Sequence, residues 1–450
     1  MRAPKRALGL FAIALVVALA FFVVPDVTDS GQQASADAPF QLIYYDGHMH
    51  TTRSDGSGSV ADIKATAQAR GLSAVIITDH CTSLTQENWT SLKAETAAAS
   101  DSTFLALPAF EITGSEGLLN RGHMNAYNAP DPFVGDDSLE LCPEEVWPDP
   151  PNPAGTGANA ESLEKWASYV HSQGGIANHN HTSGSTQLSY GVNNIEIYNQ
   201  GHVDDVASYA AQLGYPPEQA WQFGIMLNNL AIYGERDLGI EVPFPGFEDP
   251  IPVKVAVYLA TAYFTGVGQW LGAPQAPLNS WDDLLMAYVD GTVKRPIFAV
   301  ANSDAHNTGD ADSNVGVAKN GLYVKALTAD EVYKAIKSGR SFATTGPSIA
   351  FDINGKLMGS TVKIASGDTA KLKLDVTAET PGYILYEIRI VENGAAWPTI
   401  SPLSPTYQAT LSDTVSADGY YRIEVTSVPA PGVPGLPQFA YSNPVFVDVP

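Results

Sequence analysis

The sequence predicts an α/β fold of mainly parallel strands, followed by a small C-terminal β-sandwich. Between residues 40 and 347, short apolar runs typical of buried strands alternate with segments whose apolar residues recur at helical spacing. Between 348 and 450, apolar and polar residues alternate one by one, which indicates half-buried strands. In addition, side chains that can bind metal ions follow the apolar runs of the first part, as catalytic groups do in α/β barrels.

Residues 1–39 have the pattern of an export segment. Arg2, Lys5 and Arg6 precede an uncharged run at 8–24, and a polar stretch rich in small residues follows. The run is slightly long for a signal core and at the lower edge of a membrane span, so cleavage and retention as an N-terminal membrane anchor both stay open. We expect an exported protein that is either secreted or anchored.

The composition indicates an acidic globular protein and disfavours nucleic acid as a partner. The chain has 24 lysine and arginine residues against 48 aspartate and glutamate residues, and the resulting net charge of -24 repels polyanions. Its two cysteines, Cys81 and Cys142, are too few for a disulfide framework. A single bridge stays open for an oxidising compartment, but we interpret Cys81 as a buried thiol.

The predicted elements follow a repeated order along the chain. Apolar runs at 42–45, 74–77 and 104–110 are predicted strands, and each leads to histidine or acidic residues. Between the first two runs, a helix is expected to start at Ser59 and to stop at Gly71.

The same order recurs in the second half. A helix that stops at Gly174-Gly175 precedes a strand leading to His181, and a strand at 297–301 leads to Asp304. Thr328 is expected to open the last helix before the β-sandwich.

A mostly helical insertion at about 200–294 interrupts this order. Its segment 255–270 carries no charged residue and is apolar enough to resemble a membrane helix. A single crossing there would separate Asp304 and His306 from the earlier candidate ligands, which is incompatible with one site. We therefore interpret the segment as a buried helix or an apolar lid over the site.

Six of the nine histidines fall into one ordered series with carboxylates. A multinuclear transition-metal site needs such a series, because each ion takes about four to six ligands and neighbouring ions share a bridging carboxylate. Residues two apart lie on the same side of an extended strand, which pairs His48 with His50 and Asp304 with His306. The candidate metal ligands are His48, His50, Asp55, His80, Glu111, His123, His181, Asp304 and His306.

The motifs around these ligands have a specific form and order. They include Asp46-Gly47-His48-Met49-His50, Ile77-Thr78-Asp79-His80, Phe110-Glu111-Ile112-Thr113, Gly122-His123 and Asn302-Ser303-Asp304-Ala305-His306. Together they resemble the polymerase and histidinol phosphatase (PHP) superfamily of metal-dependent hydrolases. The stretch at 339–347 and the ending Tyr441-Ser442-Asn443-Pro444 look more like its carbaryl-hydrolase-like branch.

This resemblance implies a distorted (β/α)7 barrel of the PHP type that holds two or three divalent ions of zinc, manganese or iron. By the family pattern, the first ion is held by His48, His50, Glu111 and Asp304. The second is held by Glu111, His123 and His181, and the third by Asp55, His80 and His306. His179, close to a proposed ligand, is a candidate proton carrier.

Neighbouring metal ions that activate water favour a hydrolase. Our first expectation is a phosphoesterase that acts on a small-molecule ester, with Arg53, Arg121 and Arg340 as candidates for binding phosphate oxygens. A carboxyl- or carbamate-ester hydrolase is one alternative, and an inactive exported metal-binding or cell-surface module is another. We expect membrane contact only through the N-terminal segment or the apolar insertion, and the sequence leaves the oligomeric state open.

Overall fold

The computed structural model describes most of the chain after residue 39. Phe40–Pro450 forms one compact unit. The predicted export segment, the uncharged segment 255–270, and the candidate residues Arg121 and His181 lie outside the described residues. The described residues are 40–113, 123–129, 132, 166–180, 191–201, 203–204, 207–208, 216, 221, 241–242, 251–252, 281–309 and 313–450.

One sheet is built outward from β1 (Gln41–Asp46). On one edge, β1 runs parallel to β2 (Ala74–Ile77), which runs parallel to β3 (Leu105–Pro108). On the other edge, β1 pairs antiparallel with β11 (Lys319–Val324), and β11 pairs antiparallel with β12 (Ser341–Thr344). The strands predicted from the first two apolar runs are confirmed.

A second sheet has the strand order β10-β7-β6-β5-β4. Within it, β6 (Ile176–His179), β7 (Asn194–Asn199) and β10 (Phe298–Asn302) run parallel. The hairpin of β4 (Phe110–Thr113) and β5 (His123–Tyr127) is antiparallel, because the segment between them is too short for a crossover helix. The predicted α/β class is therefore confirmed, whereas the expectation of mainly parallel strands holds for only part of each sheet.

Two isolated bridges join these sheets beyond the ends of β1 and β2. Met49 pairs with Ala305 and His80 pairs with Glu111, both in parallel orientation. The carboxyl ends of strands from both sheets consequently meet at one place. The described strands do not establish a closed (β/α)7 barrel, so that finer prediction is not settled by them.

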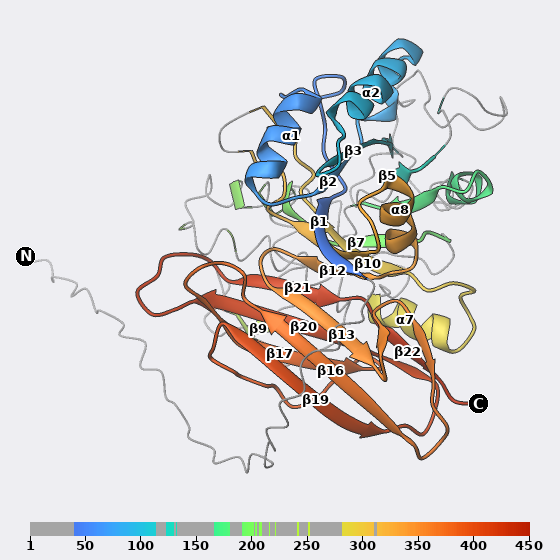
Figure 1. Ribbon diagram of the computed structural model, residues 1–450, viewed down its shortest axis with the longest axis vertical. Coiled ribbons are helices and arrows are strands. Elements are labelled where there is room, and N and C mark those ends of the chain that lie inside the picture. Colours follow the sequence, from blue (N-terminus) through green and yellow to red (C-terminus); the bar gives the residue numbers. More distant parts are fainter. Residues whose placement is uncertain are drawn as a thin grey trace, which may run out of the picture. The chain divides into compact units, whose positions relative to one another are not determined.

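Helices α1 and α2 pack against β2 and β3 (Figure 1). α1 begins at the predicted Ser59, whose backbone N–H donates to the Asp62 carboxylate at 2.9 Å, and Gly71 follows its end with a φ of 76°. The last helix likewise begins after Thr328, whose hydroxyl accepts from the N–H of Glu331 at 3.3 Å. The helices are α1 (Val60–Ala69), η1 (Cys81–Ser83), α2 (Gln86–Ala99), α7 (Trp281–Val289) and α8 (Ala329–Lys337).

Two apolar cores lie on opposite faces of the strands. Val75 of β2 packs in one core with Ile63 of α1 and Leu92 of α2. Ile76, the next residue of β2, packs in the other core with Ile336 of α8. Alternation along the strand therefore buries both faces of β2, which explains why this run is continuously apolar.

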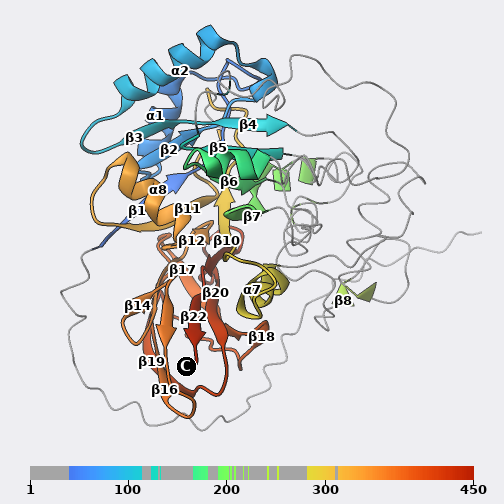
Figure 2. The same cartoon turned by 90° about the vertical axis from the view of Figure 1, so that its right-hand side faces the viewer.

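The C-terminal strands form two layers around a shared core (Figure 2). One layer has the order β14-β13-β16-β19, and Leu372, Leu374 and Val376 of β16 point from it into the core, which confirms their predicted alternation. β17 and β20 of the other layer contribute Ile388 and Ile423. The strands of this part are β13 (Ser348–Ile353), β14 (Lys356–Leu357), β15 (Thr361–Lys363), β16 (Thr369–Thr377), β17 (Tyr383–Glu392), β18 (Ala395–Ala396), β19 (Thr406–Thr414), β20 (Gly419–Pro429), β21 (Gln438–Ser442) and β22 (Val445–Asp448).

Two short features complete the strand assignment. β8 (Glu241–Val242) and β9 (Ile251–Pro252) pair with each other within the predicted insertion. The predicted turn at Asn393-Gly394 joins β17 to β18, with φ angles of 50° and 77°. Two successive positive φ angles are what a two-residue type I′ hairpin requires, and asparagine and glycine tolerate them best.

Side-chain amides take the place of a neighbouring strand along one edge of β10. The Asn443 amide accepts from the N–H of Ala299 at 2.8 Å and donates to its carbonyl at 3.1 Å. Asn320 makes the same pair of bonds with Ala301, at 2.9 and 2.7 Å. Since Asn443 follows β21 and β21 pairs with β12, hydrogen bonding continues across the boundary predicted between 347 and 348. That boundary stays a prediction.

A buried ion cluster joins α7 to β20. The Arg422 guanidinium donates two hydrogen bonds of 2.8 Å to the Asp282 carboxylate and one of 2.6 Å to Glu424. The Tyr420 hydroxyl donates to Asp282 at 2.6 Å, and the guanidinium lies over the ring of Trp281. Arg422 has no exposed surface, so both carboxylates depend on it for compensation of their charge.

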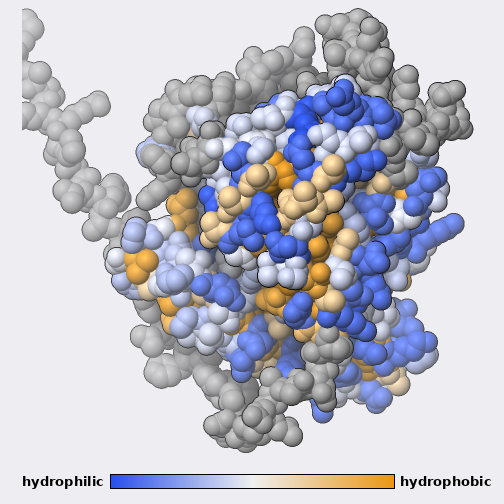
Figure 3. Space-filling view, turned by 45° about the horizontal axis from the view of Figure 1, so that its top comes forward, coloured by the Kyte–Doolittle hydropathy of each residue, from blue (hydrophilic) through white to orange (hydrophobic). Residues whose placement is uncertain are grey.

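The described surface is mixed in character. On the face in Figure 3, hydrophilic residues surround smaller groups of hydrophobic ones. Among the described residues, no helix is both long and apolar enough to span a bilayer.

Replacing Arg422 is expected to destabilise the protein strongly. Arg422→Met leaves the buried Asp282 and Glu424 carboxylates without their buried cation, and we expect the free energy of unfolding to fall by about 3–5 kcal/mol. The control is Arg389→Met, because Arg389 also faces Glu424 but is 31% exposed, and its loss should cost less than about 1 kcal/mol. Denaturant titration of both variants measures the difference, and equal losses would contradict this assignment.

Candidate metal centre

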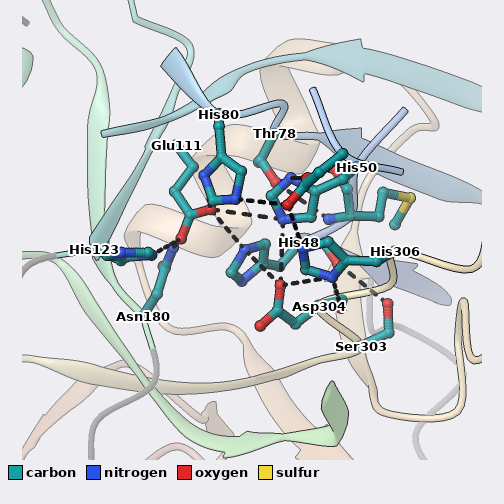
Figure 4. A network of polar contacts seen from close by, with 12 residues as sticks. His48, His50, Thr78, His80, Glu111, His123, Asn180, Ser303, Asp304 and His306 are labelled. Carbon is teal, nitrogen blue, oxygen red and sulfur yellow. Dashed lines mark hydrogen bonds and ion pairs between the residues drawn. The ribbon is translucent and has the colours of Figure 1, made fainter. Parts of the chain in front are cut away.

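His48 and His50 follow β1 and converge on two carboxylates (Figure 4). Both histidines are completely buried, with ring centroids 5.2 Å apart. Their Nε2 atoms lie 3.1 and 3.2 Å from Oδ1 of Asp304, and 3.4 and 3.6 Å from Oε2 of Glu111. The prediction that these two imidazoles face the same way is confirmed.

Glu111 stands at the centre of the cluster. Its Oε2 lies 3.0 Å from Nδ1 of His80, and its Oε1 lies 3.0 Å from Nδ1 of His123. The Asn180 side chain donates to Oε1 at 2.8 Å. Glu111 is fully buried. Its two oxygens contact different imidazoles, as those of a bridging ligand would.

Asp55 gathers an outer group of imidazoles. Its Oδ2 lies 3.3 Å from Nε2 of His306 and 3.4 Å from Nε2 of His80, and its Oδ1 lies 3.6 Å from Nδ1 of His50. The Asp55 side chain is 52% exposed and that of His306 is 43% exposed, whereas Glu111 is fully buried. This group therefore forms the solvent-facing side of the cluster.

Local backbone geometry explains two of these positions. Asp304 has a φ of 51°, a left-handed conformation that aspartate tolerates better than most residues. The expectation that Asp304 and His306 share a side because the backbone is extended is therefore wrong, although both reach the cluster. Gly56 follows Asp55 where any side chain would overlap the His50 carbonyl, so only glycine fits this turn.

Three overlapping sets of donor atoms could each hold a metal ion. Within each set, the nitrogen and oxygen atoms lie within 4.8 Å of one another. The donor types, imidazole and carboxylate, suit divalent zinc, manganese or iron. The sets are His48, His50 and Glu111; His80, Glu111 and His123; and His50, Asp55, His80 and His306.

These sets match the expected grouping in large part. Asp304 lies beside the first set, and His181, expected in the second, lies outside the described residues. His80 belongs to both the second and the third set, which the family pattern did not imply.

The electrostatics of the cluster are dominated by its carboxylates. Burial lowers the pKa of His80, but Asp55 and Glu111 outweigh burial and raise this pKa to about 10. Burial also lowers the pKa of His48, while the surrounding carboxylates, Asp304 foremost, raise it well above its usual value. The pKa of Glu111 is lowered in spite of burial, because His48 and its neighbours favour the ionised form. A site that attracts protons in this way also favours divalent cations.

The Asp79 side chain supports the cluster but was not predicted as a site residue. The Asp79 carboxylate accepts from the backbone and hydroxyl of Thr51 at 2.7 and 2.8 Å, and from the Ser54 hydroxyl at 2.8 Å. It thereby fixes the segment between His50 and Asp55. Asp79 lies inside a predicted ligand motif, which could have indicated its importance. Its partners Thr51 and Ser54 are distant in the chain, so the motif alone does not reveal them.

The candidate catalytic residues lie in different places. Arg53 pairs with Glu95 and donates to Ser91 on α2 at 3.1 Å. Arg340 lies over the ring of Phe40, at the end of β1 opposite to His48. Arg340 therefore lies away from the cluster. The Arg53 guanidinium is engaged by Glu95 and Ser91 and not by the cluster. Arg121 lies outside the described residues.

His179 is buried on β6 but lies on the wrong face for the predicted role. Its neighbour Asn178 points to Glu196 and Asn180, on the side of the cluster. Successive residues of a strand point to opposite faces, so the His179 side chain lies on the other face of β6. The expectation that it carries protons at the cluster is not supported by this geometry.

Cys81, next to His80, is disulfide-bonded. The prediction of a buried free thiol is therefore wrong, although Cys81 is buried. The chain has only one other cysteine, Cys142, which lies outside the described residues. The bond holds η1 at the point where His80 enters the cluster.

Comparison with known proteins gives only distant likenesses. No protein-family model matches the chain, and no curated protein matches it. A two-domain protein from Bacteroides vulgatus, containing a predicted PHP-like metal-dependent phosphoesterase, is 13% identical over 89% of this chain and 95% of its own, with a TM-score of 0.38.

Two further solved structures have lower TM-scores. A candidate metal-dependent phosphoesterase from Bifidobacterium adolescentis is 16% identical over 48% of this chain and 95% of its own, with a TM-score of 0.22. An amidohydrolase from Chromobacterium violaceum is 15% identical over 37% and 81%, with a TM-score of 0.24. These values are too low to assign the chain to a family.

The shared position of Glu111 predicts unequal effects of two substitutions on metal content. Glu111→Gln should lower the bound metal more than Asp55→Asn, because Glu111 belongs to two donor sets and Asp55 to one. The control is Asp290→Asn on an exposed loop, which should retain the full content. Elemental analysis after dialysis provides the measurement, and a Glu111→Gln variant with undiminished metal would refute the shared site.

Proposed function

We propose that this protein is a hydrolase of the PHP type, with a distorted (β/α)7 barrel, that uses two or three divalent ions of zinc, manganese or iron to cleave small-molecule phosphoesters. The observation that carries the proposal is the convergence of three donor sets on shared ligands, above all Glu111. Shared ligands keep neighbouring ions close together. When bound, such ions lower the pKa of water and neutralise charge on both the attacking and the leaving oxygens.

The residues of the proposed site lie on a buried side and a solvent-exposed side. His48, His50 and Glu111 are buried and would hold ions rigidly. Asp55 and His306 are about half exposed, so substrate would approach from their side. Outside the described residues, His181 remains the proposed further ligand, and Arg121 the proposed contact for phosphate oxygens.

Hydrolysis of a carboxyl or carbamate ester is the second candidate, and one observation favours it. Arg53 and Arg340 make their contacts away from the cluster, so among the described residues neither candidate arginine is directed at a phosphate. A carbonyl ester has less negative charge to bind and would need no such residue. The carbaryl-hydrolase-like features of the sequence agree with this alternative.

Substrate profiling of the metal-loaded, full-length protein separates the two candidates. We expect hydrolysis of nitrophenyl phosphate or a nitrophenyl phosphodiester, and little turnover of matched carboxyl or carbamate esters. Asp304→Ala should lower the turnover by at least about 100-fold, in line with the loss of a ligand that positions a catalytic ion.

The Asp290→Asn variant serves as the folded control and should keep full activity. Turnover limited to carbonyl esters would replace the phosphoesterase proposal by its alternative. No turnover of either class, with metal bound, would leave an inactive metal-binding module.

We further propose that the protein is exported through its N-terminal segment. The disulfide at Cys81 supports this proposal, because such bonds persist in oxidising compartments. After denaturation without reductant, protein from its natural compartment should show no thiol that can be alkylated, whereas Cys81→Ser should show one. Two reactive thiols in the unaltered chain would contradict the proposal.

A further inference from the structure

Glu196 is a buried carboxylate beside the cluster that no donor set includes. It lies on β7 and is only 1% exposed. Its Oε1 lies 2.9 Å from Nδ1 of His48 and accepts from the Asn302 amide at 2.8 Å, and its Oε2 accepts from the Asn199 amide at 2.9 Å. Both carboxylate oxygens of Glu196 therefore have hydrogen-bond partners.

The partners of Glu196 direct its charge at His48. Burying a carboxylate is costly unless its oxygens are hydrogen-bonded. The amides of Asn199 and Asn302 meet this need, but amides are neutral and do not cancel the charge. His48 adds an imidazole, which can carry a positive charge, to these contacts.

This contact determines which nitrogen of His48 can bind a metal ion. A carboxylate only accepts, so Nδ1 of His48 carries the hydrogen in this contact. Nε2 is then left as the donor atom, and it lies 3.1 Å from Oδ1 of Asp304 and 3.4 Å from Oε2 of Glu111. The ring is thus oriented with the correct nitrogen toward the other ligands.

We propose that Glu196 is a positioning residue that fixes the Nδ1–H tautomer of His48 and makes its Nε2 a stronger metal donor. The inference rests on the proposed metal site. Glu196 is not a leaving-group acid, since it is 1% exposed and His48 lies between it and Glu111. It reaches the reaction only through His48.

His306 offers an internal comparison. Its Nδ1 lies 2.9 Å from the backbone carbonyl of Asp304, a neutral partner, and its side chain is 43% exposed. A carboxylate partner raises the basicity of an imidazole more than a carbonyl does. Loss of Glu196 should therefore weaken the inner ion at His48 and spare the outer ion at His306.

The test compares Glu196→Gln with Glu196→Asp and with Glu424→Gln. Glutamine keeps the shape and an acceptor oxygen but removes the charge, and aspartate keeps the charge on a shorter side chain. Glu424→Gln makes the same change at another buried carboxylate, remote from the cluster in the Arg422 contact. Co²⁺ is titrated into each chelator-treated protein, and both its affinity and its visible spectrum are recorded.

We expect Glu196→Gln to bind the inner Co²⁺ about 10- to 100-fold more weakly, with an altered spectrum. Glu196→Asp should recover part of the affinity, and Glu424→Gln should match the unaltered protein. Unchanged affinity and spectrum in Glu196→Gln would overturn the proposal.

A second measurement needs no substitution, in case Glu196→Gln does not fold. Long-range ¹H–¹⁵N spectra of the zinc-loaded protein should identify a histidine with Nδ1 protonated and Nε2 bound to metal, absent from the spectrum of His48→Gln. The reverse tautomer at His48 would refute the proposal. Because metal binding is measured without substrate, failure of the phosphoesterase proposal would leave this result unaffected.

Discussion

The burial of the Glu111 carboxylate is the constraint on which the rest of the site depends. An ionised carboxylate without exposed surface costs several kcal/mol unless it is compensated, and here the compensation comes from imidazoles and an amide. Each partner arrives from a different strand end. The Glu111 carboxylate can therefore be compensated only because the two sheets meet beyond β1 and β2.

Around Glu111 the site changes from buried side chains to solvent-exposed ones. The inner imidazole of His48 is tied to Glu196, which two asparagine amides hold in turn. In the outer group, the side chains of Asp55 and His306 are 52% and 43% exposed. The buried donors are thus separated from those that face solvent, which is the arrangement that the proposed activation of water requires.

The sequence allowed most members of the three donor sets to be predicted, because order and spacing are local properties of the chain. The strand before His48 and the helix that begins at Ser59 were likewise visible in apolar periodicity and capping residues. Arg340 was misplaced because a motif does not reveal at which end of β1 its side chain lies.

Other features could not be predicted because they depend on tertiary contacts. Glu196 stands inside a strand where an apolar residue is usual, and its role becomes visible only beside the ring of His48. The left-handed φ of Asp304 and the amide contacts of Asn443 have no periodic signature at all. These residues are polar exceptions within apolar elements, and such exceptions are where local propensity stops being informative.

The paired amide contacts on β10 bear on how this architecture could have arisen. Asn443 comes from the C-terminal layers, yet it completes the hydrogen bonding of the strand that leads to Asp304. A β domain attached by a linker could be gained, lost or exchanged without harm to its neighbour. Here the last strands support the strand that leads to the candidate metal centre, so the two halves are expected to be inherited together and to tolerate recombination poorly.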